Sequence, residues 1–120
     1  MKKGILVILG LFFLIASCSK SGSSSGGGGG GSTIDCSTVP SAFAANVNPI
    51  IQSTCATDAS CHGAGSANGP GPLLNHPQIS AAAANIKNAV ASGTMPKTGT
   101  LTTAQKNSII CWVNGGAQNN

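Results

Sequence analysis

CATDASCHG, residues 55–63, holds two cysteines separated by five residues, with a histidine directly after the second. This arrangement has two interpretations. The two thiols and the histidine hold a bound group, or both cysteines form disulfides and the histidine only lies beside one of them. The choice decides the fold, because a bound group would fill an interior for which the rest of the chain supplies few bulky side chains.

Bulky apolar residues are few once the first seventeen residues are set aside. Phe43 and Trp112 are then the only aromatic residues, and alanine supplies much of the apolar content. A domain of this size with so little large apolar surface usually depends on a disulfide, a metal or a cofactor. The four cysteines and two histidines in residues 34–120 are the candidates to provide it.

The N-terminal segment predicts export and lipid attachment. Residues 1–17, MKKGILVILGLFFLIAS, combine two lysines, an apolar run and small residues, which is typical of a secretory signal. Ile15-Ala16-Ser17-Cys18 is similar to the lipobox of bacterial lipoproteins, in which the cysteine becomes the lipidated N-terminus. We therefore expect Cys18 to anchor the chain to a membrane that it does not span. The alternatives are a chance cysteine after a cleaved signal and an uncleaved single-span anchor.

Residues 18–33 continue with a glycine- and serine-rich run that behaves as a flexible tether, reaching on the order of 20 Å. Residues 34–120 then form one small domain. Its charged side chains are three lysines and two aspartates, with a formal balance near +1: Asp35, Asp58, Lys87, Lys97 and Lys106. They form no basic stripe, which argues against a nucleic-acid partner. Only two carboxylates and no Ser-His-Asp order also argue against a hydrolase.

Three segments of the domain have helical patterns, and none predicts a pair of strands. The first begins at Asn48-Pro49, with the asparagine as the cap and the proline in the first turn. The second, residues 77–92, has apolar residues three and four apart and ends at Gly93. The third follows a capping-box pattern at residues 102–105. We expect an all-α fold with a glycine- and proline-rich loop after the histidine.

The cysteines alone do not settle their own pairing. With Cys18 lipidated, an even number remains in an oxidising compartment, and three disulfide pairings are possible among Cys36, Cys55, Cys61 and Cys111. If all four are bridged, His62 and Met95 have no role and the small core is unexplained. The residues by themselves leave these possibilities open.

Four motifs occur in one order along residues 41–118, and together they resemble the small class I c-type cytochromes. They are Cys61-His62-Gly63, Gly71-Pro72-Leu73-Leu74, Met95-Pro96 and Ile109-Ile110-Cys111-Trp112-Val113-Asn114-Gly115-Gly116-Ala117. The resemblance implies a small all-α, cytochrome c-like domain of about three short helices around one covalent haem c. The two cysteines lie five residues apart where the family has two, so we expect residues 56–60 to bulge out as a turn.

The resemblance implies roles for individual residues of the first two motifs. Cys55 and Cys61 would form thioethers with the haem, and His62 would ligate the iron. The carbonyl of Pro72 would accept a hydrogen bond from that histidine and fix its tautomer.

The later motifs imply the remaining contacts. Met95 would be the second axial ligand, and His76, at the start of the second helix, is the reserve for that position. Trp112 would pack against the first helix and the haem edge. With the other two cysteines on the haem, the resemblance implies a disulfide between Cys36 and Cys111 that ties the start of the domain to its last helix.

The function implied is electron transfer at the bacterial cell envelope, by a lipid-anchored domain in the periplasm or at the cell surface. Such a carrier is not an enzyme, has no small-molecule substrate, and meets redox partner proteins. Two alternatives remain. One is a haem-free, disulfide-stapled lipoprotein that acts as a binding or assembly module. The other, which we favour less, is a metal-binding domain in which His62, His76 and a cysteine pair hold zinc or copper.

Overall fold

The computed structural model describes residues 33–120, and these residues form an all-α fold, as the sequence predicts. No strand occurs within them. The elements are the π-helical turn η1 (Phe43–Val47) and the α-helices α1 (Asn48–Thr54), α2 (His76–Ala81), α3 (Ala83–Ser92) and α4 (Thr103–Asn114). The predicted signal segment, Cys18 and nearly all of the predicted tether lie outside the described residues.

The first predicted helix is present, but its start differs from the prediction. Asn48 does not cap α1, because the π-helical turn η1 leads directly into it and gives Asn48 helical φ and ψ angles of −57° and −44°. The side-chain oxygen of Asn48 instead accepts a hydrogen bond from the side-chain amide of Gln52 at 3.1 Å. Pro49 lies in the first turn of α1, as expected.

The second predicted helix is divided in two. Ala82 lies between α2 and α3 with φ −94° and ψ 1°, so the helical hydrogen-bond pattern is interrupted there. Alanine is the best helix former, so local propensity does not explain the break. Ala82 and Ala83 are both buried in the core, which indicates that packing decides the change of direction. Asn75 caps α2 by accepting from the Gln78 N–H at 3.1 Å, and Gly93 ends α3 in the left-handed conformation.

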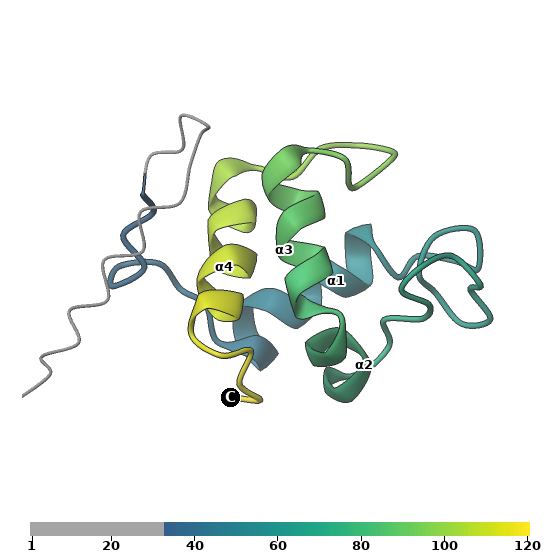
Figure 1. Ribbon diagram of the computed structural model, residues 1–120, viewed down its shortest axis with the longest axis horizontal. Coiled ribbons are helices and arrows are strands. Elements are labelled where there is room, and N and C mark those ends of the chain that lie inside the picture. Colours follow the sequence, from purple (N-terminus) through teal and green to yellow (C-terminus); the bar gives the residue numbers. More distant parts are fainter. Residues whose placement is uncertain (1–32) are drawn as a thin grey trace, which may run out of the picture. The chain divides into compact units, whose positions relative to one another are not determined.

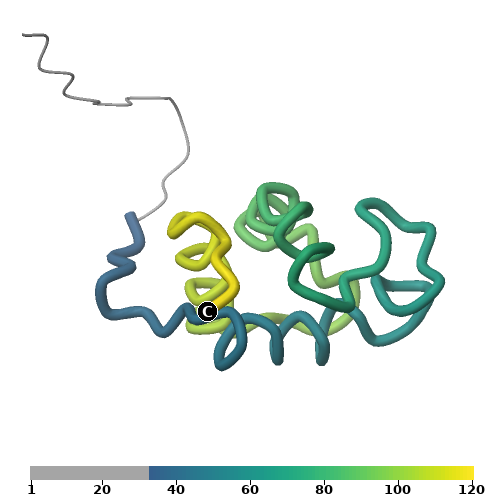
Figure 2. Tube along the Cα trace, turned by 90° about the horizontal axis from the view of Figure 1, so that it is seen from below, coloured from purple at the N-terminus to yellow at the C-terminus, as the bar shows by residue number. Residues whose placement is uncertain are grey.

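The third predicted helix, α4, has the expected capping box. The Gln105 N–H donates to the Thr102 hydroxyl at 3.2 Å, and the Thr102 N–H donates to the Gln105 side chain at 2.9 Å. The helix α4 lies beside α3 (Figure 1), and in Figure 2 the segment of η1 and α1 runs below this pair.

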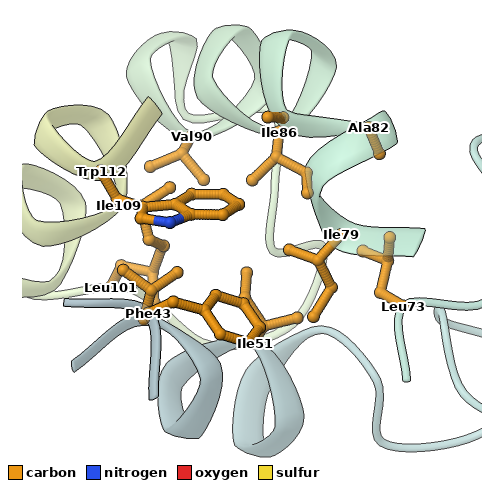
Figure 3. Packing of buried hydrophobic residues seen from close by; sticks show 12 residues of the cluster. Phe43, Ile51, Leu73, Ile79, Ala82, Ile86, Val90, Leu101, Ile109 and Trp112 are labelled. Carbon is orange, nitrogen blue, oxygen red and sulfur yellow. The ribbon is translucent and has the colours of Figure 1, made fainter. Parts of the chain in front are cut away.

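The core fills the space between these helices. Phe43 and Trp112 face each other with ring centroids 5.5 Å apart, and aliphatic side chains surround them (Figure 3). The buried cluster draws on every helix: Phe43, Val47, Ile51, Leu73, Ile79, Ala82, Ala83, Ile86, Val90, Leu101, Ile109 and Trp112. Ile86 and Val90 of α3 supply its upper side in Figure 3.

The C-terminal residues close the start of η1. The backbone carbonyl of Asn120 accepts from the Ala44 N–H at 2.8 Å, and its side chain accepts from the Phe43 N–H at 2.7 Å. These contacts pair the first N–H groups of the turn, which have no partner within it.

A disulfide joins Cys36 to Cys111, the pairing that the resemblance implies. The two Cα atoms are 5.4 Å apart, and the bridge attaches the segment before η1 to the buried face of α4. It spans 75 residues of sequence, which is most of the described chain. The unfolded chain is therefore strongly constrained by it.

Removing this bridge should lower the free energy of unfolding by about 4 kcal/mol, because the loop it closes is long. The double variant Cys36→Ala/Cys111→Ala is compared with the parent by urea denaturation. The matched control is Cys55→Ala/Cys61→Ala, which removes two thiols that form no disulfide in the structure. Equal urea midpoints for the two double variants would contradict the stabilising role of the bridge.

Candidate functional site

A cavity of about 380 Å³ lies between the end of α1, the loop that follows it, the helix α3 and the loop after α3. Its size is within the range of small-molecule and cofactor sites. Cys55, Cys61, His62 and Met95 all line it, although the first and last of them are separated by most of the fold's loops and two helices. The structure therefore brings together the four residues that the sequence predicts to hold a haem.

His62 is held in one orientation at the cavity wall. Its side chain is buried, with 8% of its surface exposed, and its Nδ1 lies 3.1 Å from the Gly71 carbonyl oxygen. A carbonyl only accepts hydrogen bonds, so Nδ1 carries a proton in this contact, which leaves Nε2 as the ring nitrogen that can ligate a metal. Nε2 makes no hydrogen bond within residues 33–120, and no fully buried side-chain nitrogen there lacks a partner. Nε2 is therefore not fully buried, and it retains access to the cavity that His62 lines.

The acceptor differs by one residue from the prediction. The carbonyl that meets His62 belongs to Gly71 and not to Pro72. Gly71 has a positive φ of 93°, which turns its carbonyl toward the ring and which residues with side chains rarely adopt. The backbone also joins the two segments, because the Leu73 N–H donates to the His62 carbonyl at 2.8 Å.

The segment between the two cysteines leaves the helix as a turn, as predicted. The His62 N–H donates to the Cys55 carbonyl at 2.8 Å, and this hydrogen bond closes a loop around residues 56–61. The five intervening residues therefore do not separate the ends of the motif as a helix would. Both thiols remain at the same cavity.

Asp58 organises this loop from its exposed tip. Its carboxylate accepts from the Ser60 N–H at 2.8 Å, the Ser60 hydroxyl at 2.6 Å and the Cys61 N–H at 3.1 Å. These hydrogen bonds, first of all the one from the Ser60 hydroxyl, lower the pKa of the Asp58 carboxyl. Its backbone carbonyl also accepts from the Cys61 and Gly63 N–H groups at 3.1 and 2.7 Å.

Gly63 allows the loop to close. A Cβ atom at this position would lie 2.7 Å from the carbonyl carbon and oxygen of Asp58, which is closer than carbon atoms can pack. Only glycine therefore fits directly after His62 in this arrangement. Gly63 belongs to the Cys61-His62-Gly63 motif, whose residue types alone do not indicate this steric role.

Cys55 and Cys61 are free thiols in this structure. Burial is the main cause that raises the pKa of the Cys55 thiol, the Thr54 hydroxyl 3.7 Å away lowers it slightly, and the proximity of Cys61 raises it further. The interpretation in which all four cysteines are bridged is therefore wrong for this structure. Cys55 is kept as a protonated, partly buried thiol at ordinary pH.

Met95 reaches the cavity from the loop after α3. Gly93 ends the helix, and the Met95 N–H donates to the Ala89 carbonyl at 3.2 Å, so the loop folds back onto the last turn of α3. The Thr94 hydroxyl donates to the same carbonyl at 3.2 Å. Met95 is thereby placed next to the apolar wall of the cavity, which Leu73, Ile86, Ala89 and Val90 form.

The structure does not bring His76 or Trp112 to the cavity. His76 Nε2 lies 2.9 Å from the Ala117 carbonyl, and its ring packs edge-on against Phe43 at 4.7 Å, so it is half-buried elsewhere. The Trp112 indole donates to the Gln118 carbonyl at 2.8 Å and belongs to the core. Trp112 packs against Phe43 of the first helical segment, and its contact with a haem edge stays a prediction. A metal site made jointly by both histidines is wrong, because His76 does not line the cavity that holds His62.

Sequence reasoning missed several residues that build the site. Asp58, Gly63 and Gly71 act through backbone hydrogen bonds and close approaches, which motif spacing does not reveal. An aspartate two residues before a serine is a local signal for the turn that Asp58 makes. The close approach at Gly63 has no such signal, because it depends on how the loop closes.

Replacing Gly63 with alanine should lower the free energy of unfolding by about 1 to 3 kcal/mol, because the added Cβ displaces the Asp58 backbone. Urea denaturation of Gly63→Ala measures the loss. Gly69→Ala is the matched control, since a Cβ there would meet nothing within 4 Å. A Gly63→Ala variant as stable as the control would show that the loop has another conformation in solution.

The Cys55 thiol should react with iodoacetamide only at a higher pH than an ordinary exposed thiol, because burial raises its pKa and the thiolate is the reactive form. Mass spectrometry of the haem-free protein after timed alkylation between about pH 7 and 10 measures the profile. The variant Thr54→Val should move it further upward, since it removes the hydroxyl that lies 3.7 Å from the Cys55 Sγ and lowers the pKa of the thiol. An unshifted profile in both proteins would contradict this environment.

Within residues 33–120, no three His, Cys, Asp or Glu side chains are grouped so that they could hold a metal ion. None of the helices in this part of the chain is long and apolar enough to cross a bilayer. Comparison with protein-family models, curated proteins and solved structures gave no match for this chain.

Proposed function

We propose that this domain binds one covalent haem c and transfers electrons at the bacterial cell envelope. The observation that carries the proposal is that Cys55, Cys61, His62 and Met95, taken from two separate loops, line one cavity. Their convergence on an apolar pocket, with both cysteines reduced, is what a thioether-linked haem requires.

The residues present fit the group. The thiols that would form thioethers are free, while the other two cysteines are joined to each other. The histidine next to the second thiol has its Nδ1 engaged and its Nε2 available, which is the form that ligates a metal. The apolar wall made by Leu73, Ile86 and Val90 would give a porphyrin apolar contacts.

Haem, when bound, supplies an iron that gains or loses one electron. The chain's own residues would set the conditions for this exchange. Cys55 and Cys61 would fix the group, and the Gly71 carbonyl would orient His62 and strengthen it as a ligand. Met95 would offer a thioether sulfur from the loop after α3, which favours the reduced state. Burial by the wall of α3 would exclude water from the site.

The proposal extends to the surroundings of the domain. A lipid on Cys18 and a glycine- and serine-rich tether would let the domain move between redox partner proteins while it remains at the membrane. The domain would therefore be an electron carrier without substrate chemistry of its own. The direction of electron flow is set by the partners.

Expression in a host that matures c-type haem should give a coloured protein whose Soret band survives acid-acetone extraction. The variant His62→Ala should lose the low-spin spectrum, because it loses an axial ligand. Met95→Ala should keep the covalent haem but lose the sulfur-to-iron charge-transfer band at the red end of the oxidised spectrum. Absorption spectroscopy of the purified parent, His62→Ala and Met95→Ala proteins measures these spectra.

His76→Ala is the matched control for His62→Ala, because it removes the other histidine of the domain without touching the cavity. Its spectrum should equal that of the parent. A parent that carries no haem under these conditions would overturn the proposal and favour a haem-free binding module. A parent with haem but without the red band would leave haem in place and remove Met95 as its ligand.

A further inference from the structure

The polar side chains that line the cavity fall into two groups. Those beside the cysteine motif are already engaged with the protein. The Thr54 hydroxyl donates to the Ile50 carbonyl, the Ser60 hydroxyl to Asp58, and the Asn68 amide to the Ser60 carbonyl. A ligand that approached this side would have to break an existing hydrogen bond to gain a new one.

The second group lies on the other wall. Asn85 comes from α3, and Lys97 and Thr98 follow Met95 in the next loop. All three are exposed at the cavity, and within residues 33–120 their side chains make no hydrogen bond or ion pair. Their donors are therefore free to meet a ligand. Water fills that role when no ligand is present.

Among the described residues 33–120 that line the cavity, Lys97 alone carries a formal charge. The two aspartates of the domain are elsewhere, Asp35 in a turn with Ser37 and Asp58 in the cysteine loop. The lysine thus gives one wall of an otherwise neutral and largely apolar cavity a positive charge. A ligand with an apolar body and an anionic end matches this distribution.

We propose that Lys97, assisted by Asn85 and Thr98, forms a carboxylate subsite that receives the propionate groups at one edge of the haem. This inference rests on the proposed function, because it assigns the orientation of the same ligand. It deepens that proposal by naming the wall toward which the two carboxylates point. The propionates would then lie at the loop after α3, away from the already bonded polar groups of the cysteine motif.

Lys97 acts here as a positioning residue with an electrostatic effect. Its positive charge offsets a nearby carboxylate, and the oxidised iron carries one more positive charge than the reduced iron. Without the lysine, the uncompensated carboxylate stabilises the oxidised form, so the reduction potential falls. The same carboxylate also has a higher pKa when it lacks a cationic neighbour, so the potential becomes more dependent on pH near neutrality.

The test compares Lys97→Met with Lys106→Met in the full holoprotein, by redox titration from about pH 5 to 9 at low and high salt. Lys106 lies on α4, does not line the cavity and loses the same charge. The potential of Lys97→Met should lie below that of the control, with a steeper pH dependence. The difference should shrink at high salt, because exposed charges are screened. Equal potentials and pH profiles in the two variants would overturn the subsite.

A second measurement does not depend on covalent attachment. In the background Cys55→Ala/Cys61→Ala, haem and its dimethyl ester are titrated into the protein and the two affinities are compared. Free haem should bind more tightly than the ester, and Lys97→Met should reduce this preference by about two- to fivefold, the range of an exposed ion pair.

An unchanged preference, together with tight binding of both compounds, would overturn the subsite and leave the haem proposal standing. Failure of both compounds to bind, with a colourless parent, would overturn the haem proposal and the subsite with it. A preference that falls equally in Lys106→Met would assign the effect to net charge and also overturn the subsite.

Discussion

The candidate site depends on one backbone hydrogen bond, from the His62 N–H to the Cys55 carbonyl at 2.8 Å. Six residues of helix would carry the ends of this segment about 9 Å apart along the axis. The hydrogen bond instead brings the end of the motif back to its start, and the residues between them project as a loop. From the exposed tip of the loop, Asp58 accepts hydrogen bonds from Ser60 and Cys61, and Gly63 leaves the room that the Asp58 backbone needs. A motif with unusual spacing can therefore present its three functional side chains to one cavity.

The helix α3 serves the core and the cavity with neighbouring parts of one surface. Ile86 and Val90 belong to the buried cluster around Trp112 and also line the cavity. The core is thus complete without a bound group on the side of α4, where Trp112 and Phe43 pack against each other (Figure 3). On its other side, the core borders the cavity. Few bulky residues are therefore needed to pack the side of the core next to α4. The disulfide adds stability there, because it holds α4 to the start of the domain.

Local patterns predicted the helices well and their junctions poorly. The capping box of α4, the left-handed end of α3 at Gly93 and the proline of α1 depend on neighbouring residues, so the sequence contains their signal. The break at Ala82 and the π-helical turn before Asn48 depend on packing between segments that are distant in sequence. Local propensity alone predicts a continuous helix through Ala82 and a helix cap at Asn48.

The same distinction applies to the site. The residues with their own chemistry, two thiols, an imidazole and a thioether, were predictable from type and order, and the structure gathers them. The residues that position them act through main-chain atoms, whose direction no motif specifies. The resemblance places the hydrogen-bond acceptor for His62 at the Pro72 carbonyl. In the structure the acceptor is the carbonyl of Gly71, whose positive φ is a conformation that favours glycine. The resemblance implies that Trp112 packs against the first helix and a haem edge. Phe43 and the Gln118 carbonyl satisfy its ring and its N–H within the core, which leaves aliphatic side chains to line the cavity.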